Sequence, residues 1–311
     1  MSRIHEALEK ARRQQSGSTP ELPNVEEIIA AGVPSPDPEL AADIGPDDEP
    51  LDRLKTVEDR GEILEHCPQL NWPITGKALI FLADESHAAG QEQFRTLRSR
   101  LYQLRGSGSL KVIVVCSAIP GEGKSFVSAN LAHAFALQSD RRALVVDADL
   151  RRAGGLSTLL EAPHTPGLTD YLLGEQSAAD IIQTGSLKDL YLIPSGKRVP
   201  KPGELIGDSK LGTLIEQLRP LFDWIIIDTP PILPIADARM IADLSDGVLM
   251  VVNAPSTLAH LAKRAIKQFR RDSLVGVVLN RTLEPSASYY SAYGHGYGPD
   301  ANSGVRSAHS T

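Results

Sequence analysis

The sequence of 311 residues has few of the features that mark secreted, membrane-spanning or nucleic-acid-binding proteins. It holds two cysteines, and Cys116 lies inside an apolar run, so a disulfide framework is not expected. No signal peptide opens the chain, and no apolar run reaches the ~18 residues that a membrane-spanning helix needs. The net charge of −7 comes without a clustered basic face, which argues against nucleic acid as a partner. We therefore expect a cytoplasmic protein whose membrane contacts, if it makes any, run through a partner.

Composition divides the chain into four regions, 1–15, 16–76, 77–281 and 282–311. The first places Ile4, Leu8 and Ala11 at helical spacing among charged residues, which predicts a short amphipathic helix. This helix is interpreted either as an incidental feature of the N-terminus or as a docking element attached to the fold by a flexible linker. The second region is rich in proline and acidic residues, so we expect a mostly disordered linker. The last is a polar, tyrosine-rich tail that we expect to be flexible.

The region 77–281 alternates strand-like and helix-like segments, a pattern typical of βαβ units around a parallel sheet. Most of the strand-like segments are uninterrupted apolar runs, as expected where helices cover both faces of the sheet. The clearest expected strands are 112–116, 143–146, 190–193, 224–227, 247–252 and 275–279. The predicted fold class is α/β, with a mostly parallel sheet and helices on both faces.

A glycine-rich loop joins the first of these strands to an expected helix at 127–137. It reads Ala118-Ile119-Pro120-Gly121-Glu122-Gly123-Lys124-Ser125, a Walker A pattern in which alanine replaces the usual first glycine. Its glycines let backbone N–H groups approach phosphate oxygens, and the helix N-terminus favours negative charge. Lys124 is expected to bridge the β and γ phosphates, while Ser125 offers its hydroxyl to Mg²⁺.

This strand, loop and helix together predict a P-loop nucleotide hydrolase fold that binds ATP with Mg²⁺. The expected ATP contacts are Pro120, Gly121, Glu122, Gly123, Lys124, Ser125 and Phe126.

Three aspartates are placed to join this loop at the carboxyl edge of the sheet, where open α/β sheets bind their ligands. Asp147 and Asp149 follow one expected strand, and Asp228 follows the apolar run 224–227. Asp228 is interpreted as a Walker B residue, a carboxylate that holds Mg²⁺ directly or through water. A single strand-end aspartate is more often a helix cap or turn residue. Three of them beside a Walker A loop favour a metal-binding and catalytic role.

The order of these motifs resembles that of the bacterial tyrosine kinases of exopolysaccharide and capsule systems, over roughly residues 92–297. Residues 120–125 resemble the Walker A motif of that family, 147–151 its Walker A′ and 228–231 its Walker B. Asn280 stands where the fold family commonly contacts adenine. The residues that match the EX2RX2R oligomerisation motif of the family are Glu92, Arg95 and Arg98.

The resemblance implies a kinase that phosphorylates its own C-terminal tyrosines in trans. The residues that look like the tyrosine cluster of the family are Tyr289, Tyr290, Tyr293 and Tyr297, four of the seven tyrosines in the chain. The implied catalytic set is Lys124, Asp147, Asp149 and Asp228. Within it, Asp147 is favoured as the base, with Ser125, Asp149 and Asp228 around Mg²⁺; the sequence alone does not separate the two Walker A′ roles.

The resemblance also implies partners. Glu92, Arg95 and Arg98 would hold copies of the chain in a ring. The sequence carries no fused transmembrane adaptor, so it resembles the split cytoplasmic kinases that need a separate membrane activator of the polysaccharide co-polymerase class. Such an activator would recruit the protein to the inner face of the cell membrane.

Two other functions fit the same motifs. The first is a non-kinase ATPase of the MinD and ParA type, whose characteristic lysine is replaced here by Ile119. The second is a nucleotide-binding regulatory subunit without transferase activity. Glu92 and Arg95 also read as an ordinary pair on a solvated helix, worth about 0.2 to 0.5 kcal/mol, and the tyrosines as a low-complexity tail.

Overall fold

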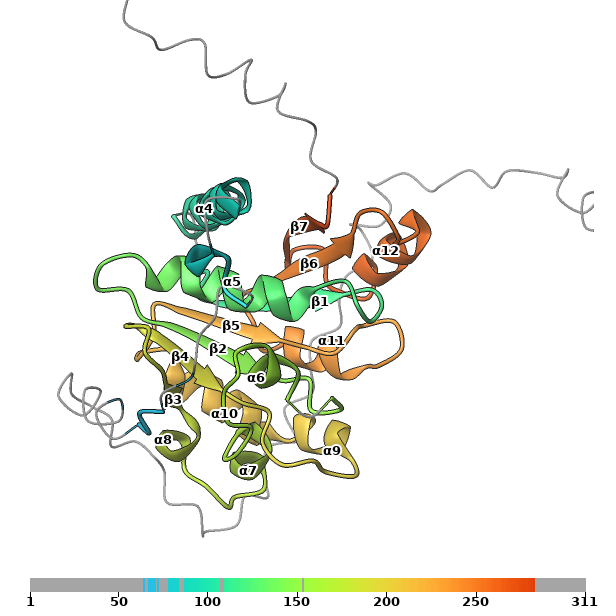
Figure 1. Cartoon of the computed structure of the whole chain (residues 1–311). Helices are drawn as coiled ribbons and strands as arrows, with labels where there is room; N and C mark the ends of the chain where they lie inside the picture. The colour runs from blue at the N-terminus through green and yellow to red at the C-terminus, as the bar shows by residue number, and fades with distance from the viewer. Residues whose placement is uncertain are drawn as a thin grey trace, which may run out of the picture. The chain divides into compact units, whose positions relative to one another are not determined.

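The computed structural model describes residues 64, 67–70, 72, 78–83, 87–106, 109–152 and 154–282. Their centre is a seven-stranded sheet in the order β3-β4-β2-β5-β1-β6-β7 (Figure 1). Neighbouring strands pair in parallel except β3 and β4, which are antiparallel. The predicted α/β class with a mostly parallel sheet is confirmed. The strands are β1 Val112–Ser117, β2 Ala143–Asp147, β3 Gln183–Thr184, β4 Leu190–Ile193, β5 Trp224–Asp228, β6 Gly247–Asn253 and β7 Leu274–Asn280.

Helices pack on both faces of this sheet and enclose one hydrophobic core on each side. One face carries the 3-10 helix η1 Ile80–Leu82 and the helices α4 Ala88–Arg105, α5 Lys124–Ala136 and α6 Gly155–Leu159. The opposite face carries α7 Leu168–Leu172, α8 Ala178–Ile181, α9 Pro202–Ile206, α10 Ser209–Leu218, α11 Asp237–Ala242 and α12 Ala259–Ile266.

The strands agree closely with the expectation. All six expected strands are present, and each boundary falls within one residue of its predicted position. β3 was not predicted, because a strand of two residues is too short to show an alternating pattern. β7 also differs from a strand covered on both faces: it lies at the sheet edge, and 46% of Val277 and 60% of Leu279 remain exposed.

Aromatic packing fixes α4 and α5 against the sheet. The rings of Phe135 on α5 and Trp224 on β5 are stacked with centroids 4.1 Å apart, and Tyr102 on α4 meets Trp224 edge-on at 5.2 Å. The guanidinium of Arg105 lies 4.9 Å from the Trp224 ring centroid. Large aromatic contacts of this kind contribute beyond their buried area. They hold α5, the helix that follows the glycine-rich loop, in a fixed position.

The fold begins earlier in the chain than the predicted boundary at residue 77. Trp72 is 2% exposed and packs beside Gly185. The backbone of Leu70 donates to Thr184 at 2.8 Å, and Gln69 forms an isolated bridge with the same residue. Burial of Trp72 explains the difference, since apolar area removed from water stabilises the segment that carries it.

The expected helix in residues 1–15, most of the expected linker and the tail from 283 onward lie outside the described residues. Among the residues that are described, no helix combines the length and the apolar character needed to cross a membrane.

Candidate active site

The glycine-rich loop turns directly from β1 into α5. Gly121 has φ 84° and Gly123 has φ 91°, both in the left-handed region that favours glycine. A Cβ at position 123 would also collide with Nδ2 of Asn280. α5 begins at Lys124 with no side-chain cap at its N-terminus, so its first N–H groups stay available to an anion. This is the anion-binding geometry that the Walker A pattern predicts.

Lys124 lies at the base of this loop, facing an acid of the second motif. Its Nζ is 3.6 Å from Oδ2 of Asp149, and the two side chains are only 9% and 10% exposed. A buried ammonium beside a single carboxylate is well suited to hold additional negative charge, such as phosphate oxygens.

Asp147 and Asp228 end the adjacent strands β2 and β5 in register. Burial raises the pKa of Asp147 to about 8, with the charge of Asp228 as the next cause. Two backbone N–H groups hold its carboxylate, that of Leu156 at 3.1 Å and that of Asp149 at 3.3 Å. Burial also raises the pKa of Asp228, to about 6, while Lys124 acts to lower it. The three predicted acids therefore meet at one edge of the sheet, beside the loop.

The residues at this edge fit a magnesium ion. Oδ1 of Asp228 accepts a hydrogen bond from Ser128 at 3.2 Å, whereas the buried Oδ2 has no hydrogen-bond partner. A buried oxygen of this kind is costly unless something pairs with it, and carboxylate and hydroxyl oxygens are the ligands that Mg²⁺ prefers. No group of three or more His, Cys, Asp or Glu residues in the described part of the chain could hold a metal. Binding of Mg²⁺ by Ser125, Asp149 and Asp228, together with phosphate oxygens, stays a prediction.

The side chains of two of the expected ATP-binding residues are engaged by other parts of the protein. Glu122 is 1% exposed: its Oε2 accepts from Ile119 N at 2.8 Å, and its Oε1 accepts from Thr257 Oγ1 at 2.6 Å and from Asn253 N at 3.2 Å. The ring of Phe126 packs against Phe94 on α4, with centroids 6.2 Å apart. Any contact of these two residues with the nucleotide would run through their backbone.

Asn280 reaches the loop from the end of β7. Its Nδ2 donates to the carbonyl oxygen of Glu122 at 2.8 Å. The structure thus brings the last residue of the sheet to the glycine-rich loop, and its contact with adenine stays a prediction.

The three α4 residues of the oligomerisation motif have different surroundings. Glu92 and Arg95 form an exposed pair at 3.1 Å, and Arg95 also lies 5.6 Å from the ring centroid of Phe81. Arg98 instead donates from Nη1 to the carbonyl oxygen of Ala134 on α5 at 2.6 Å. Arg98 is therefore engaged within its own subunit, while Glu92 and Arg95 face solvent.

The structure describes three of the seven tyrosines. Tyr289, Tyr290, Tyr293 and Tyr297 lie outside the described residues. Tyr102 buries its hydroxyl oxygen in the fold, and burial raises the pKa of both Tyr171 and Tyr191.

Some contacts at the site could not be predicted from the sequence. Ser128 and Thr257 contact it as described above, and Arg151 forms a bidentate ion pair with the buried Asp237 at 2.8 and 3.0 Å. Arg151 lies in the Walker A′ stretch, but its partner is 86 residues away, on α11.

Comparison with known proteins agrees with this geometry. A family model described as AAA domain matches residues 110–272. Tyrosine-protein kinase YwqD of Bacillus subtilis is 33% identical over 217 residues, which cover 69% of this chain and 91% of that protein. Succinoglycan biosynthesis transport protein ExoP of Rhizobium meliloti is 31% identical over 228 residues, covering 70% of this chain and 29% of that protein. The crystal structure of the chimerical protein CapA2B2 is similar with a TM-score of 0.62 and 30% identity, over 74% of this chain and 100% of that one.

A glycine-rich loop between a central strand and a helix, with aspartates at the carboxyl edge of a parallel sheet, defines the P-loop nucleotide hydrolase class. Within that class, the chain belongs to the bacterial tyrosine kinase family, whose members take part in capsule and exopolysaccharide biosynthesis.

Proposed function

We propose that the protein uses Mg-ATP to phosphorylate its own C-terminal tyrosines, and so regulates the polymerisation and export of an exopolysaccharide or capsule. The acceptors are Tyr289, Tyr290, Tyr293 and Tyr297. The observation that carries the proposal is the buried ion pair of Lys124 Nζ with Oδ2 of Asp149, 3.6 Å apart. Asp147 and Asp228 end the two neighbouring strands beside it.

The chemistry follows from phosphoryl transfer, in which a protein positions groups and offsets developing charge. Lys124 and the N-terminus of α5 hold the phosphates. Ser125, Asp149 and Asp228 would hold Mg²⁺, which would supply positive charge to the transferred phosphoryl group. Asp147, the first acid of its motif, accepts the proton of the tyrosine hydroxyl, whose ordinary pKa is near 10.

Transfer between subunits fits the point at which the chain leaves the fold after β7. The last strand ends at Asn280, beside the glycine-rich loop, and Tyr290 follows ten residues later. Ten extended residues reach at most about 35 Å, a span suited to the active site of a neighbour. The exposed Glu92 and Arg95 on α4 supply a surface on which neighbours can assemble into a closed ring, with Arg98 placing that helix on α5.

A separate membrane protein is the proposed activator. The name of the CapA2B2 chimera joins a CapA part to a CapB part, and ExoP, a transport protein, contains a matching segment within a much longer chain. Both cases support a kinase of this family working with a CapA-type polysaccharide co-polymerase. Such a partner would bring this protein from the cytoplasm to the inner face of the cell membrane.

A MinD- or ParA-type ATPase is the second candidate. Ile119 replaces the lysine characteristic of that group, and its backbone N–H is bound to Glu122 at 2.8 Å. The third candidate is a nucleotide-binding regulatory subunit.

Incubation of the pure protein with γ-labelled ATP and Mg²⁺ separates these functions. Label on tyrosine supports the kinase, released phosphate alone supports the ATPase, and neither supports the regulator. Lys124→Met is the catalytic control and should incorporate no label. Replacing all four tail tyrosines with phenylalanine should remove most of the label while ATP still binds. Phosphopeptides that map to the ordered Tyr102, Tyr171 or Tyr191 would contradict the assignment of the acceptors.

A further inference from the structure

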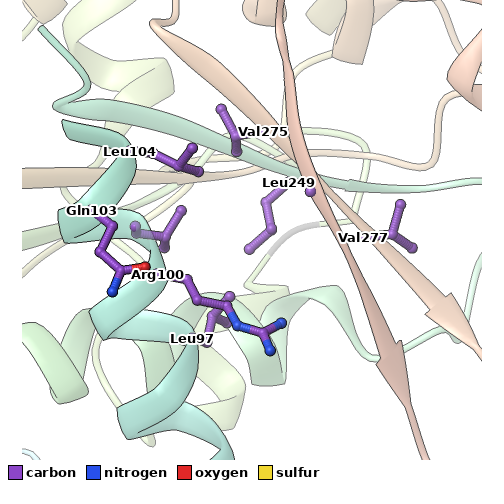
Figure 2. A pocket seen from close by; sticks show the side chains of 9 residues that line it. Leu97, Arg100, Gln103, Leu104, Leu249, Val275 and Val277 are labelled. Atoms are coloured by element: carbon purple, nitrogen blue, oxygen red, sulfur yellow. The ribbon is translucent and has the colours of Figure 1, made fainter. Parts of the chain in front are cut away.

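A hollow of about 420 Å³, lined by both apolar and polar groups, lies between α4 and the strands β6 and β7. Its apolar lining consists of Leu97, Leu101, Leu104, Leu249, Val275 and Val277. In Figure 2 the side chains of Leu104 and Leu249 point toward each other across this space, with Arg100 and Gln103 also on the helix wall. The hollow lies along the first half of β7, whereas the glycine-rich loop meets the end of that strand.

β7 itself offers a free edge beside this hollow. It is the last strand of the sheet, so within the described part of the chain no strand pairs with its outer side. Val277 and Leu279 are 46% and 60% exposed. An open edge with exposed apolar side chains is a ready site for one more extended segment.

The path of the chain identifies a candidate for that segment. β7 ends at Asn280, and Arg281 follows with φ 55°, the left-handed conformation common where a strand reverses into a hairpin. The N–H of Arg281 donates to Oδ1 of Asn280 at 2.9 Å. The tail therefore leaves the fold at the strand that forms one wall of the hollow.

The lengths agree with a return along β7. The strand has seven residues and spans roughly 20 Å. Tyr289 and Tyr290 follow Thr282 by seven and eight residues, and an extended segment of eight residues reaches at most about 28 Å. Residues 283–293 can thus run back beside the strand and bring one of these tyrosines to the hollow.

We propose that residues 283–293, when unphosphorylated, add to the outer edge of β7 and bury a tyrosine ring in the hollow of the same chain. Tyrosine suits this position because its ring is apolar, while its hydroxyl can reach the polar Arg100 and Gln103. A phosphorylated ring does not suit it, since a dianion among leucine side chains loses hydration that one arginine does not replace.

The hollow is thereby a storage site for the acceptor segment. Docking there keeps Tyr289, Tyr290 and Tyr293 away from every active site, and assembly into a ring withdraws the segment into the site of a neighbour. The docking needs no catalysis, so it stands or falls separately from the proposed kinase activity.

Hydrogen exchange tests the docking in full-length Lys124→Met protein, kept dilute enough to be monomeric. The amides of 283–293 should exchange about tenfold more slowly than in a synthetic peptide of residues 283–311. Leu104→Asp should abolish this protection, because it places a charge in the hollow at a side chain already 45% exposed. Leu137→Asp, at a side chain 54% exposed that does not line the hollow, should leave it intact. Exchange as fast as in the peptide would overturn the proposal.

A disulfide test identifies the occupant. Two cysteine pairs are made in the Lys124→Met background, Gln103→Cys with Ser291→Cys and Gln103→Cys with Ala292→Cys, because position 291 shares a strand face with Tyr289 and position 292 with Tyr290. One of the two pairs should form an intramolecular disulfide under mild oxidation, and which one does so identifies the buried tyrosine. The native Cys67 and Cys116 are 5% and 0% exposed and should not compete. The control pair Glu216→Cys and Ser291→Cys, with position 216 on the opposite face of the sheet, should form none. A covalent dimer on a non-reducing gel would show instead that the hollow holds the tail of a second copy, and absence of both products would show that the tail does not reach it.

Discussion

Asp147 and Asp228 stand side by side at the ends of two neighbouring parallel strands, and the N–H of Ala148 donates to the carbonyl oxygen of Asp228 at 2.8 Å. Both side chains are at most 1% exposed. Two buried carboxylates lose hydration and repel each other when both are ionised, so their proximity costs stability in the nucleotide-free protein. That cost is expected where a site is arranged to hold a cation.

Asp228→Asn should therefore separate stability from activity. The unpartnered Oδ2 becomes an amide group that can donate to neighbouring carboxylates, while Oδ1 keeps its bond from Ser128. We expect the free energy of unfolding of the nucleotide-free protein to rise by about 1–2 kcal/mol. Tyrosine phosphorylation should fall by about 100-fold or more, because one charge at the metal is lost.

Urea unfolding and label incorporation over a range of Mg²⁺ concentrations measure both effects. Asp243→Asn, at the exposed residue that follows the last residue of α11, is the control and should change neither. An unchanged rate at limiting Mg²⁺ would remove Asp228 from the metal site.

The sequence predicted those parts of the fold and of the site that are determined by residues close together in the chain. The strands appear as apolar runs, and the loop from 118 to 125 keeps its meaning because its strand and helix flank it directly. The side chain of Glu122 shows the limit: within the loop it resembles a phosphate contact, yet its carboxylate is bound by Asn253 and Thr257, more than 130 residues away. Exposure of β7 likewise follows from the order of the strands, which no local pattern encodes.

Glu122→Gln should weaken the loop. The carboxylate accepts three hydrogen bonds, and an amide of the same shape turns an N–H₂ group toward at least one donor. Loss of a bond within a buried set should lower the free energy of unfolding by about 1–3 kcal/mol. ATP affinity should also fall severalfold, because Ile119 and the turn after it are no longer held.

Chemical denaturation and ATP titration test this pair of effects. Thr257→Val removes one donor and should have a smaller effect in the same direction. Glu204→Gln, whose side chain is 70% exposed, is the control. Stability lost without any change in ATP affinity would show that Glu122 braces the fold but not the nucleotide site.

Arg95→Ala and Arg98→Ala should differ, although both lie in the same motif. The exposed pair of Arg95 with Glu92 is worth about 0.2–0.5 kcal/mol, so its loss should leave stability nearly unchanged. Arg98 bonds the carbonyl oxygen of Ala134, and its loss should cost about 1–2 kcal/mol of unfolding free energy. If Arg95 serves assembly, its variant should be smaller in solution at unchanged stability, as seen by light scattering and thermal unfolding. Equal losses of stability in both variants would mean that the motif acts within one subunit only.

Phosphorylation of the tail should open the assembly. Each phosphotyrosine adds about −1.5 to −2 charge, so four add roughly −6 to −8 beside bound phosphates and the three aspartates of the site. Repulsion of this size should expel the tail from a neighbouring active site, which leaves the contacts of α4 alone to hold the ring.

We expect Lys124→Met and the variant with four phenylalanines in the tail to be oligomeric, and the phosphorylated protein to be largely monomeric. Light scattering after size exclusion at near-physiological salt measures this, with Arg95→Ala as the variant weakened at the contact itself. The phenylalanine variant is the sharpest control, since it meets ATP and Mg²⁺ with its active site intact and yet cannot charge its tail. Identical masses with and without phosphorylation would remove the switch and leave the kinase assignment untouched, whereas dissociation of the phenylalanine variant on adding Mg-ATP would show that nucleotide, rather than tail charge, opens the ring.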